Sequence, residues 1–409
     1  MNPKLVDKTT ELSKLISPRI DKNKPIYRWH SFKHGYSKEL VDRFIDEFKI
    51  TDRSIVLDPF VGGGTTLLAC KNKNIDAVGI DISPFSVFLS KAKTNNYNII
   101  ELKSSLKIIE NLFNKKSAHK IYHVPDIPLI KKAFRKDIWN EINSIKDVIN
   151  RIDSEKNKKF FLLALFSILE AVSNTTKSGG FLRITKRNIK SGKAKKIFLE
   201  YSQSMINDLM NSTIHKNGTK IKVQIGDARR LGSINKFDAI ITSPPYPNRH
   251  DYTRIYALEL ILNFIKNNNE LKKLRYKTLR SHVEARERFD SSGYKRPTKL
   301  IKLIKRIETN GINNNQIIDM LTGYFEDMYL CLKEMKRVLK RKRKIALVVS
   351  NVRFSGINIP VDEILGELGE KAGLKLSEIR IARYRGNSSQ QMRDYKRCLS
   401  RESIIIWEN

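Results

Sequence analysis

The chain has few cysteines and no pattern of residues typical of a metal site. Its 409 residues include only Cys70, Cys331 and Cys398, which lie far apart in the sequence. This spacing argues against a disulfide framework and favours a reducing compartment. The seven histidines also form no pair with metal-ligand spacing. We therefore expect a cytoplasmic protein that binds no metal.

Long apolar stretches are also lacking. No run of residues is long and apolar enough to cross a bilayer, and the N-terminal residues contain no hydrophobic signal core. We therefore expect no membrane association. The length is enough for a full α/β core and a second, smaller domain.

Acidic residues are scarce relative to basic ones. The chain has 78 Lys and Arg against 43 Asp and Glu, which gives a net charge of +35. Such an excess favours a polyanionic partner, above all nucleic acid. Part of the lysine content accompanies many Asn and Ile residues, a bias that a genome can produce without selection for binding. Lysine-rich faces that are only solvated are therefore the alternative.

A strand followed by a glycine-rich turn and a helix gives the first indication of a site. Residues 54–57 are typical of a buried strand, and Gly62 to Gly64 precede a helix that starts at Thr65. Glycines let the backbone approach a ligand, and a helix N-terminus offers unpaired N–H groups. A second strand ends at Asp81, about 20 residues further on, where a carboxylate can accept both hydroxyls of a ribose. The turn alone could be structural, but its combination with Asp81 predicts a nucleoside-containing ligand.

A polar residue, two prolines and an aromatic follow another strand-like run. Residues 237–242 lead into Ser243-Pro244-Pro245-Tyr246. Each proline fixes φ and removes an N–H, which leaves the Ser243 hydroxyl and the Pro244 carbonyl to accept hydrogen bonds. Tyr246 offers a ring face on which a flat base can stack. This combination suits the exocyclic amino group of a base, although two prolines after a strand can also form only a stiff turn.

Together these motifs resemble the amino-methyltransferases that use S-adenosylmethionine, specifically the DNA methyltransferases that modify cytosine N4 or adenine N6. The resemblance implies a cofactor loop at Asp58 to Gly64, a ribose carboxylate at Asp81 and a catalytic motif at Ser243 to Tyr246. Serine in the first position of this motif looks like the cytosine-N4 members. Adenine-N6 members more often carry Asp or Asn there.

Further segments fit the same family. Gly226-Asp227-Ala228 follows a strand and resembles the position that hydrogen-bonds the cofactor's adenine. The segment from Trp29 to Phe32, before Ser37, is similar to the N-terminal element that closes over the methionine end. Residues 385–392 and 401–407 look like the end of restriction-type members. The resemblance implies no metal, and it implies catalytic roles for Ser243, Pro244, Pro245 and Tyr246 and cofactor contacts from Trp29, Ser37, Asp58, Pro59, Phe60, Gly62, Gly64, Thr65, Asp81, Ile82, Asp227 and Ala228.

The expected fold is α/β: a Rossmann-like, seven-stranded, mostly parallel sheet whose last strand is antiparallel, with helical insertions for DNA recognition. The apolar periodicity predicts helices near 38–48, 134–152, 160–172, 197–210 and 317–339, a strand near 344–351, and an antiparallel pair at 376–383 and 402–407. We divide the chain into an N-terminal element with the cofactor-binding half (1–98), a helical insertion (99–220), the catalytic half (221–263), a basic polar insertion (264–316) and the C-terminal part of the catalytic domain (317–409).

Two regions are candidates for DNA recognition. The helical insertion contains a glycine-rich basic loop at residues 177–183, and the polar insertion mixes basic and aromatic residues between 266 and 306. Basic residues interleaved with aromatics suit phosphate contacts and base stacking, although either region could be a solvated helical surface. The residues proposed to contact DNA are Lys177, Arg183, Arg249, Arg275, Arg280 and Arg296.

The function that these expectations imply is site-specific methylation of cytosine N4 in double-stranded DNA after base flipping. S-adenosylmethionine would be the methyl donor and a cognate restriction endonuclease would be a partner. Three alternatives stay open: adenine-N6 methylation of DNA, methylation of a base amino group in RNA, and a non-enzymatic nucleic-acid-binding protein on a degenerate scaffold. Retention of Asp58, Gly62, Gly64, Asp81 and Ser243 argues against the last of these.

Overall fold

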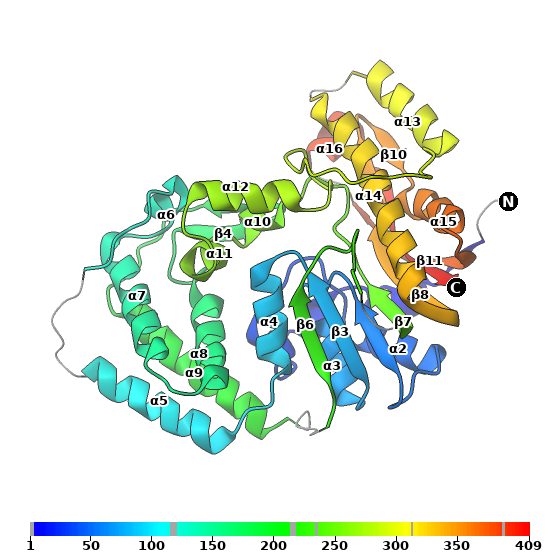
Figure 1. Cartoon of the computed structure of the whole chain (residues 1–409). Coiled ribbons are helices and arrows are strands. Elements are labelled where there is room, and N and C mark those ends of the chain that lie inside the picture. The colour runs from blue at the N-terminus through cyan, green and yellow to red at the C-terminus, as the bar shows by residue number, and fades with distance from the viewer. Residues whose placement is uncertain (1–3, 115–120, 213–217, 234–235, 312–313, 387–388) are drawn as a thin grey trace.

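A single large sheet organises the catalytic part of the chain (Figure 1). The computed structural model describes residues 4–114, 121–212, 218–233, 236–311, 314–386 and 389–409, so that Asn387 and Ser388 of the C-terminal motif lie outside it. The spatial order of the strands is β1 (Leu5–Asp7), β11 (Lys375–Gly386), β12 (Leu399–Glu408), β8 (Leu339–Ser350), β7 (Phe237–Thr242), β2 (Ile55–Asp58), β3 (Asp76–Asp81) and β6 (Ile221–Ile225).

The directions of the strands confirm the expected fold and add one element to it. β12 pairs antiparallel with both β8 and β11, whereas the other neighbouring pairs are parallel. This is the predicted mostly parallel sheet with a reversed last strand. The eighth strand, β1, extends the edge beyond β11. It was not predicted because a run of three residues is too short to show a strand periodicity.

Both faces of the sheet are covered because its strands are apolar on both sides. Val56 and Ile241 belong to a core with α2 (Lys38–Glu47) and α3 (Thr65–Asn72). Their neighbours Leu57 and Ile240 point the other way, into a core with α14 (Gln316–Val338) and α15 (Val361–Lys371). This alternation follows from the two-residue period of a strand. The carboxyl ends of β2, β3 and β7 consequently meet at one edge, where the chain order of the strands changes direction.

The helical insertion lies beside the β6 edge of the sheet, with α4 (Pro84–Thr94) between them (Figure 1). It consists of α5 (Ile99–Asn114), α6 (Pro128–Ala133), α7 (Lys136–Asn150), α8 (Glu155–Ile168), α9 (Lys193–Met210) and a hairpin of β4 (Thr175–Ser178) and β5 (Phe181–Ile184). The helix predicted at 134–152 begins only at Lys136, because Phe134 and Arg135 are extended. The hairpin was expected as a loop.

The insertion shares its hydrophobic core with other parts of the chain. The N-terminal Ile26 and Trp29, and Phe85 of α4, are buried in the same cluster as the insertion helices. The short helices α10 (Tyr252–Ile255) and α11 (Ala257–Asn263), after the Ser-Pro-Pro-Tyr motif, belong to it too. The core therefore crosses the proposed boundaries at residues 98 and 220, and these domain limits remain a proposal.

The polar insertion and the C-terminal region complete the chain. α12 (Asn268–Lys277) leads to α13 (Thr298–Thr309), whose Leu300 and Ile307 pack in the core of α14. A ribbon of β9 (Val352–Phe354) and β10 (Ile357–Ile359) and the helix α16 (Ser389–Asp394) lie near α13 in Figure 1. The N-terminus contributes α1 (Thr9–Leu12) and two 3₁₀ turns at Pro18–Asp21 and Tyr27–Trp29. No helix within the described ranges is long and apolar enough to span a membrane.

A buried ion pair holds the β4–β5 hairpin to the catalytic half. Glu259 of α11 is 1% exposed and pairs with the Lys177 ammonium, and it also accepts from His30 Nε2 at 3.2 Å. Burial alone would raise the pKa of Glu259, but Lys177 and His30 outweigh it and hold the pKa at about 2. Lys177, proposed above as a DNA contact, is therefore a structural cation.

Replacing Lys177 tests this structural role. We expect Lys177→Met to lower the free energy of unfolding by about 3–5 kcal/mol, because it leaves the Glu259 carboxylate buried without a cation. Urea denaturation gives this value, and Lys186→Met, at an exposed position, serves as the control with a change within about 0.5 kcal/mol. A Lys177→Met protein with wild-type stability and weakened DNA binding would contradict the assignment.

Candidate active site

The glycine-rich loop between β2 and α3 forms one wall of a cavity. Gly64 caps the helix with φ +79°, a conformation that favours glycine. A Cβ on Gly63 would come within 2.8 Å of the Phe32 Cβ, so the N-terminal segment lies directly on the loop. Phe32 in turn stacks on Tyr256, with ring centroids 4.8 Å apart. Because Gly62 and Gly63 have no side chains, Phe32 can pack directly over the loop.

Asp81, at the end of β3, fixes the shape of this loop. Its carboxylate accepts the Gly62 N–H at 3.0 Å and the Ser83 N–H at 2.8 Å. Burial raises the pKa of Asp81 to about 6, although these two N–H groups act in the opposite direction. Asp81 lines the cavity, and each of its two carboxylate oxygens keeps a second lone pair. The carboxylate can therefore hold the loop and accept two ligand hydroxyls together.

Asp58, at the end of β2, joins three segments of the chain. Its Oδ1 accepts the Thr242 hydroxyl at 2.7 Å and the Phe60 N–H at 3.1 Å, and its Oδ2 accepts the Tyr36 hydroxyl at 3.2 Å. Thr242 directly precedes the Ser-Pro-Pro-Tyr motif. Burial raises the pKa of Asp58 despite these donors. The carboxylate thereby ties the glycine-rich loop to the Ser-Pro-Pro-Tyr motif and to the N-terminal segment.

The Ser243 hydroxyl faces the same cavity with its hydrogen already committed. It donates to the Val348 carbonyl of β8 at 3.1 Å. Because a hydroxyl has one hydrogen and two lone pairs, Ser243 Oγ is left as an acceptor. Pro245 also lines the cavity, whereas Pro244 is buried behind it. This arrangement suits a ligand that brings N–H donors.

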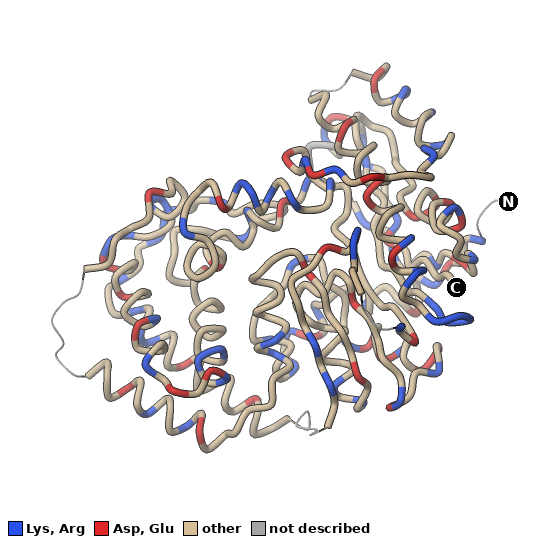
Figure 2. The backbone as a smooth tube through the Cα atoms, in the orientation of Figure 1, with Lys and Arg blue, Asp and Glu red and all other residues tan. Residues whose placement is uncertain are grey.

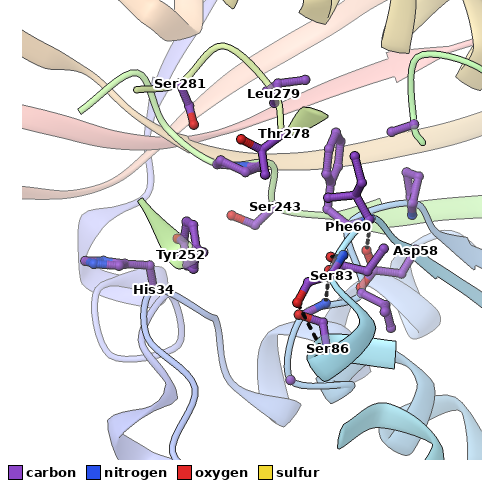
Figure 3. Close-up of a pocket in the computed structure, with 18 of the residues that line it drawn as sticks. His34, Asp58, Phe60, Ser83, Ser86, Ser243, Tyr252, Thr278, Leu279 and Ser281 are labelled. Carbon is purple, nitrogen blue, oxygen red and sulfur yellow. Dashed lines mark hydrogen bonds between the residues drawn. The ribbon is translucent and has the colours of Figure 1, made fainter. Parts of the chain in front are cut away.

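The structure does not place Tyr246 as a stacking surface. Its side chain is 5% exposed in the core of α14 and does not line the cavity. Its hydroxyl lies 3.3 Å from Ser243 Oγ and 3.4 Å from Glu402 Oε1. The ring is buried because α14 packs over it, so Tyr246 supports Ser243 from behind. Tyr252 is one of the aromatic residues that line the cavity, and its ring lies near Ser243 in Figure 3.

Two predicted cofactor contacts also lie away from the cavity. Trp29 is 1% exposed, packs edge-on against Phe160 with centroids 5.4 Å apart, and donates to Asp208 at 3.0 Å. Ser37 is fully buried and caps α2 by accepting the Leu40 N–H. Both residues anchor the N-terminal segment. The residues of that segment that line the cavity are Phe32, His34, Gly35 and Tyr36.

The remaining predicted residues are brought together. Figure 3 shows Asp58, Phe60 and Ser243 around one cavity. Gly64 shapes the loop without lining the cavity. Asp227 does line it, but its carboxylate also accepts from the Arg229 guanidinium at 2.7 Å. The predicted residues in the cavity wall are Asp58, Pro59, Phe60, Gly62, Thr65, Asp81, Ile82, Asp227, Ala228, Ser243 and Pro245.

Several cavity residues were missed by the sequence reasoning. His34 packs against His250 with ring centroids 4.5 Å apart, and burial lowers their pKa values to about 3 and about 4. Thr278, Ser281 and His282 come from the polar insertion. Nothing in their sequence spacing indicates a site, because they reach it only through the tertiary fold.

The predicted DNA contacts fall into two groups. Lys177, Arg275 and Arg280 are turned inward: Arg275 pairs with Asp251 at 2.8 Å, and Arg280 with Asp327 at 2.6 Å. Their charges pair with carboxylates inside the protein, which argues against a DNA contact, and their role in DNA binding stays a prediction. Arg183, Arg249 and Arg296 are exposed, and their role stays a prediction. Figure 2 shows basic residues distributed over both the insertion and the sheet.

One group of side chains has a geometry compatible with a cation. Asp251, His282 and Glu284 have ligand atoms within 4.8 Å of one another. Arg254 and Arg275 already pair with the two carboxylates, and His282 Nε2 contacts Thr278 Oγ1 at 2.8 Å. These contacts define an ion-pair network between α10 and the polar insertion.

The cavity defines a class of enzyme. A glycine-rich loop, a buried carboxylate at the next strand end and an acceptor platform across the switch point fit a nucleoside-containing cofactor beside an amino-bearing substrate. This combination is that of a methyltransferase that uses S-adenosylmethionine.

Comparison with known proteins narrows the class to a family. Residues 13–92 match the family model described as DNA methylase. The chain is 33% identical to the Type II methyltransferase M.BsoBI of Geobacillus stearothermophilus, with 97% of this chain and 88% of that protein covered. It is 30% identical to the Type II methyltransferase M.AvaI of Anabaena variabilis, with 96% and 88% covered. The chain belongs to the Type II DNA methyltransferase family, and its methyl donor is S-adenosylmethionine.

A solved structure was also matched at low similarity. The rRNA methyltransferase aviRa of Streptomyces viridochromogenes aligns with a TM-score of 0.32 and 9% identity, with 96% of this chain and 93% of that chain covered. Because this TM-score is low, the assignment of the fold rests on the strand order of this chain alone.

The Asp81 carboxylate predicts a pH dependence of cofactor affinity. Above pH 6 it is ionised and accepts ligand hydroxyls strongly; below pH 6 it takes up a proton and accepts weakly. We expect the affinity for S-adenosylmethionine, measured by calorimetry between pH 5 and 7, to fall as the pH drops through about 6. Asp81→Asn is the matched control. It should bind roughly tenfold or more weakly at pH 7 and lose this dependence. An unchanged pH profile in Asp81→Asn would assign the titration to another group.

Proposed function

We propose that this enzyme methylates the exocyclic N4 amino group of cytosine in duplex DNA, at a specific site, as part of a restriction-modification system. The observation that carries the proposal is the acceptor geometry of Ser243 beside the Asp81 cofactor loop. The serine in the first motif position, which resembles the cytosine-N4 members, supports cytosine over adenine. The Type II relatives support the restriction-modification setting, and a cognate endonuclease is proposed with it.

The catalytic motif would act by alignment. With its hydrogen given to Val348, Ser243 Oγ can accept one amino hydrogen of the base. The other hydrogen would go to the backbone carbonyl of Pro244, a buried residue that does not itself line the cavity, once the base has entered. These acceptors would turn the nitrogen lone pair towards the cofactor side of the cavity. The two prolines keep the acceptors in place because their φ angles are fixed. Positioning of this kind is a large part of catalysis when the donor is already activated.

The other cavity residues would hold the two ligands. Asp81 would accept the ribose hydroxyls, Asp227 would lie by the adenine, and Phe60 would pack beside the methionine part of the cofactor. S-adenosylmethionine supplies the activated methyl group. Tyr252, rather than Tyr246, presents a ring to the cavity on which the base can stack. The base must leave the duplex to reach this depth, at a cost of a few kcal/mol in unstacking.

The product identifies the reaction. Unmethylated duplex DNA is treated with the protein and S-adenosylmethionine, and its nucleosides are separated by mass spectrometry. N4-methylcytosine is the expected product. N6-methyladenine would contradict the cytosine assignment and leave the site and the cofactor unchanged. Methylated RNA, with no product on DNA, would overturn the DNA proposal.

Replacing Ser243 tests whether this residue aligns the target base without contributing to the binding of S-adenosylmethionine. We expect Ser243→Ala to lower kcat about 100-fold, because the base amino group loses an acceptor that orients it. The dissociation constant for S-adenosylmethionine should stay within about twofold, because the hydrogen bonds of Ser243 go to Val348 and Tyr246 and not to the Asp81 loop. Ser243→Thr, which keeps the hydroxyl, is the matched control. A variant that loses cofactor binding and turnover together would show that Ser243 acts on the fold of the cavity.

A further inference from the structure

The β4–β5 hairpin presents an aromatic side chain that the protein leaves uncovered. Two residues, Gly179 and Gly180, connect its strands, with Gly179 at φ +58°. Phe181 directly follows this turn and is 54% exposed. Covering apolar surface is favourable in water, so an exposed phenylalanine at the tip of a hairpin is stabilised when a partner covers it.

The hairpin is held rigidly against the catalytic half. Lys177 and Leu182 are cross-strand partners; Lys177 pairs with the buried Glu259, and Leu182 packs on the core of the insertion. The Lys177 N–H donates to Glu170 at 3.1 Å. Since side chains alternate along a strand, Phe181 and Arg183 share the opposite, exposed face of β5. An aromatic and a cation therefore stand together on an anchored support.

The tip of the hairpin lies at the entrance region of the active site. A Cβ on Gly180 would come 2.2 Å from His250 Cδ2, so the turn packs directly on the loop that follows the Ser-Pro-Pro-Tyr motif. His282 lines both the cavity that contains Ser243 and a wide groove next to it. Phe181 lines that groove. The hairpin tip and the catalytic cavity are thus reached from the same groove.

The charge of the groove suits a nucleic-acid backbone. It is lined by Arg249, Arg286 and Arg385, none of which forms an ion pair among the residues that the structure describes. The carboxylates Asp251 and Glu284 of the groove are neutralised by Arg254 and Arg275. Double-stranded DNA is the partner that combines a phosphate backbone with stacked planes into which a phenylalanine can be inserted.

We propose that Phe181 enters the base stack of the DNA next to the target base and fills the space that the base leaves when it occupies the cavity. This role rests on the proposed function, because it presumes a duplex substrate whose base is rotated out. Arg183, on the same face of β5, would contact a phosphate beside the opened step. Phe181 is then a positioning residue that stabilises the opened duplex and takes no part in methyl transfer.

The test compares DNA substrates that differ in how easily the target base leaves the base stack. The methylation rate is measured on the duplex oligonucleotide that the wild-type enzyme modifies, on the same duplex with a mismatch at the target pair, and on the corresponding single strand. We expect Phe181→Ala to lower kcat/KM on the matched duplex roughly 10- to 100-fold, the effect of losing one base–aromatic stack. On the mismatched duplex and the single strand its rate should stay within about threefold of wild type.

Two further variants and one fluorescence measurement test whether the effect is specific to the aromatic ring of Phe181. Phe181→Trp should restore the rate on the matched duplex. Ile184→Ala, which removes an exposed apolar side chain from the other face of β5, should leave all three rates unchanged. With 2-aminopurine as the target base, the rise in fluorescence on binding should be smaller for Phe181→Ala than for wild type. The melting temperature and cofactor affinity of Phe181→Ala should match wild type.

The outcomes that would overturn the inference are distinct from failure of the proposed function. Equal rates for Phe181→Ala and wild type on the matched duplex would exclude the role. An equal loss on all three substrates would assign Phe181 to general DNA binding or to the fold. If the wild-type protein methylates no DNA at all, the proposed function fails, and the role of Phe181 fails with it.

Discussion

The buried carboxylate of Asp58 is the constraint on which the active site depends. Three donors converge on it: the Phe60 N–H of the same loop, and the hydroxyls of Tyr36 and Thr242 from two other segments. Without them a fully buried carboxylate would be strongly unfavourable, so the three segments are held together by the need to satisfy one group. The glycine-rich loop and the Ser-Pro-Pro-Tyr motif are therefore held together through the same carboxylate.

A second set of buried polar contacts extends this coupling to the helical insertion. Lys93 of α4 donates to the carbonyls of Tyr27 and His30, each at 3.1 Å, and His30 contacts the Glu259 carboxylate that Lys177 neutralises. The N-terminal segment thus connects the loop that would hold the cofactor with the hairpin that faces the groove. The sequence predicts an insertion at residues 99–220, but its helices pack in one core with α10 and α11, which follow the Ser-Pro-Pro-Tyr motif.

Much of the fold and part of the site follow from the sequence because they depend on local patterns. Asp58, Asp81 and Ser243 were found because each stands at a strand end beside residues with special backbone properties. Trp29 and Tyr246 were misassigned because their motifs specify residue types, whereas burial against Phe160 and α14 decides what those rings do. Likewise, no local pattern shows that Arg280 faces Asp327 or that Thr278 reaches the cavity, since these contacts join residues far apart in the chain.

The position of β12 has a consequence for how the protein is made. This strand is translated after the other strands, yet it lies between β8 and β11 and carries Glu402, whose carboxylate contacts Tyr246 behind Ser243. During synthesis from the N-terminus, β8 and β11 have no common neighbour until β12 emerges. A nascent chain that already contains the glycine loop and Ser-Pro-Pro-Tyr still lacks the strand that contacts Tyr246, so the site is assembled only after β12 has been synthesised.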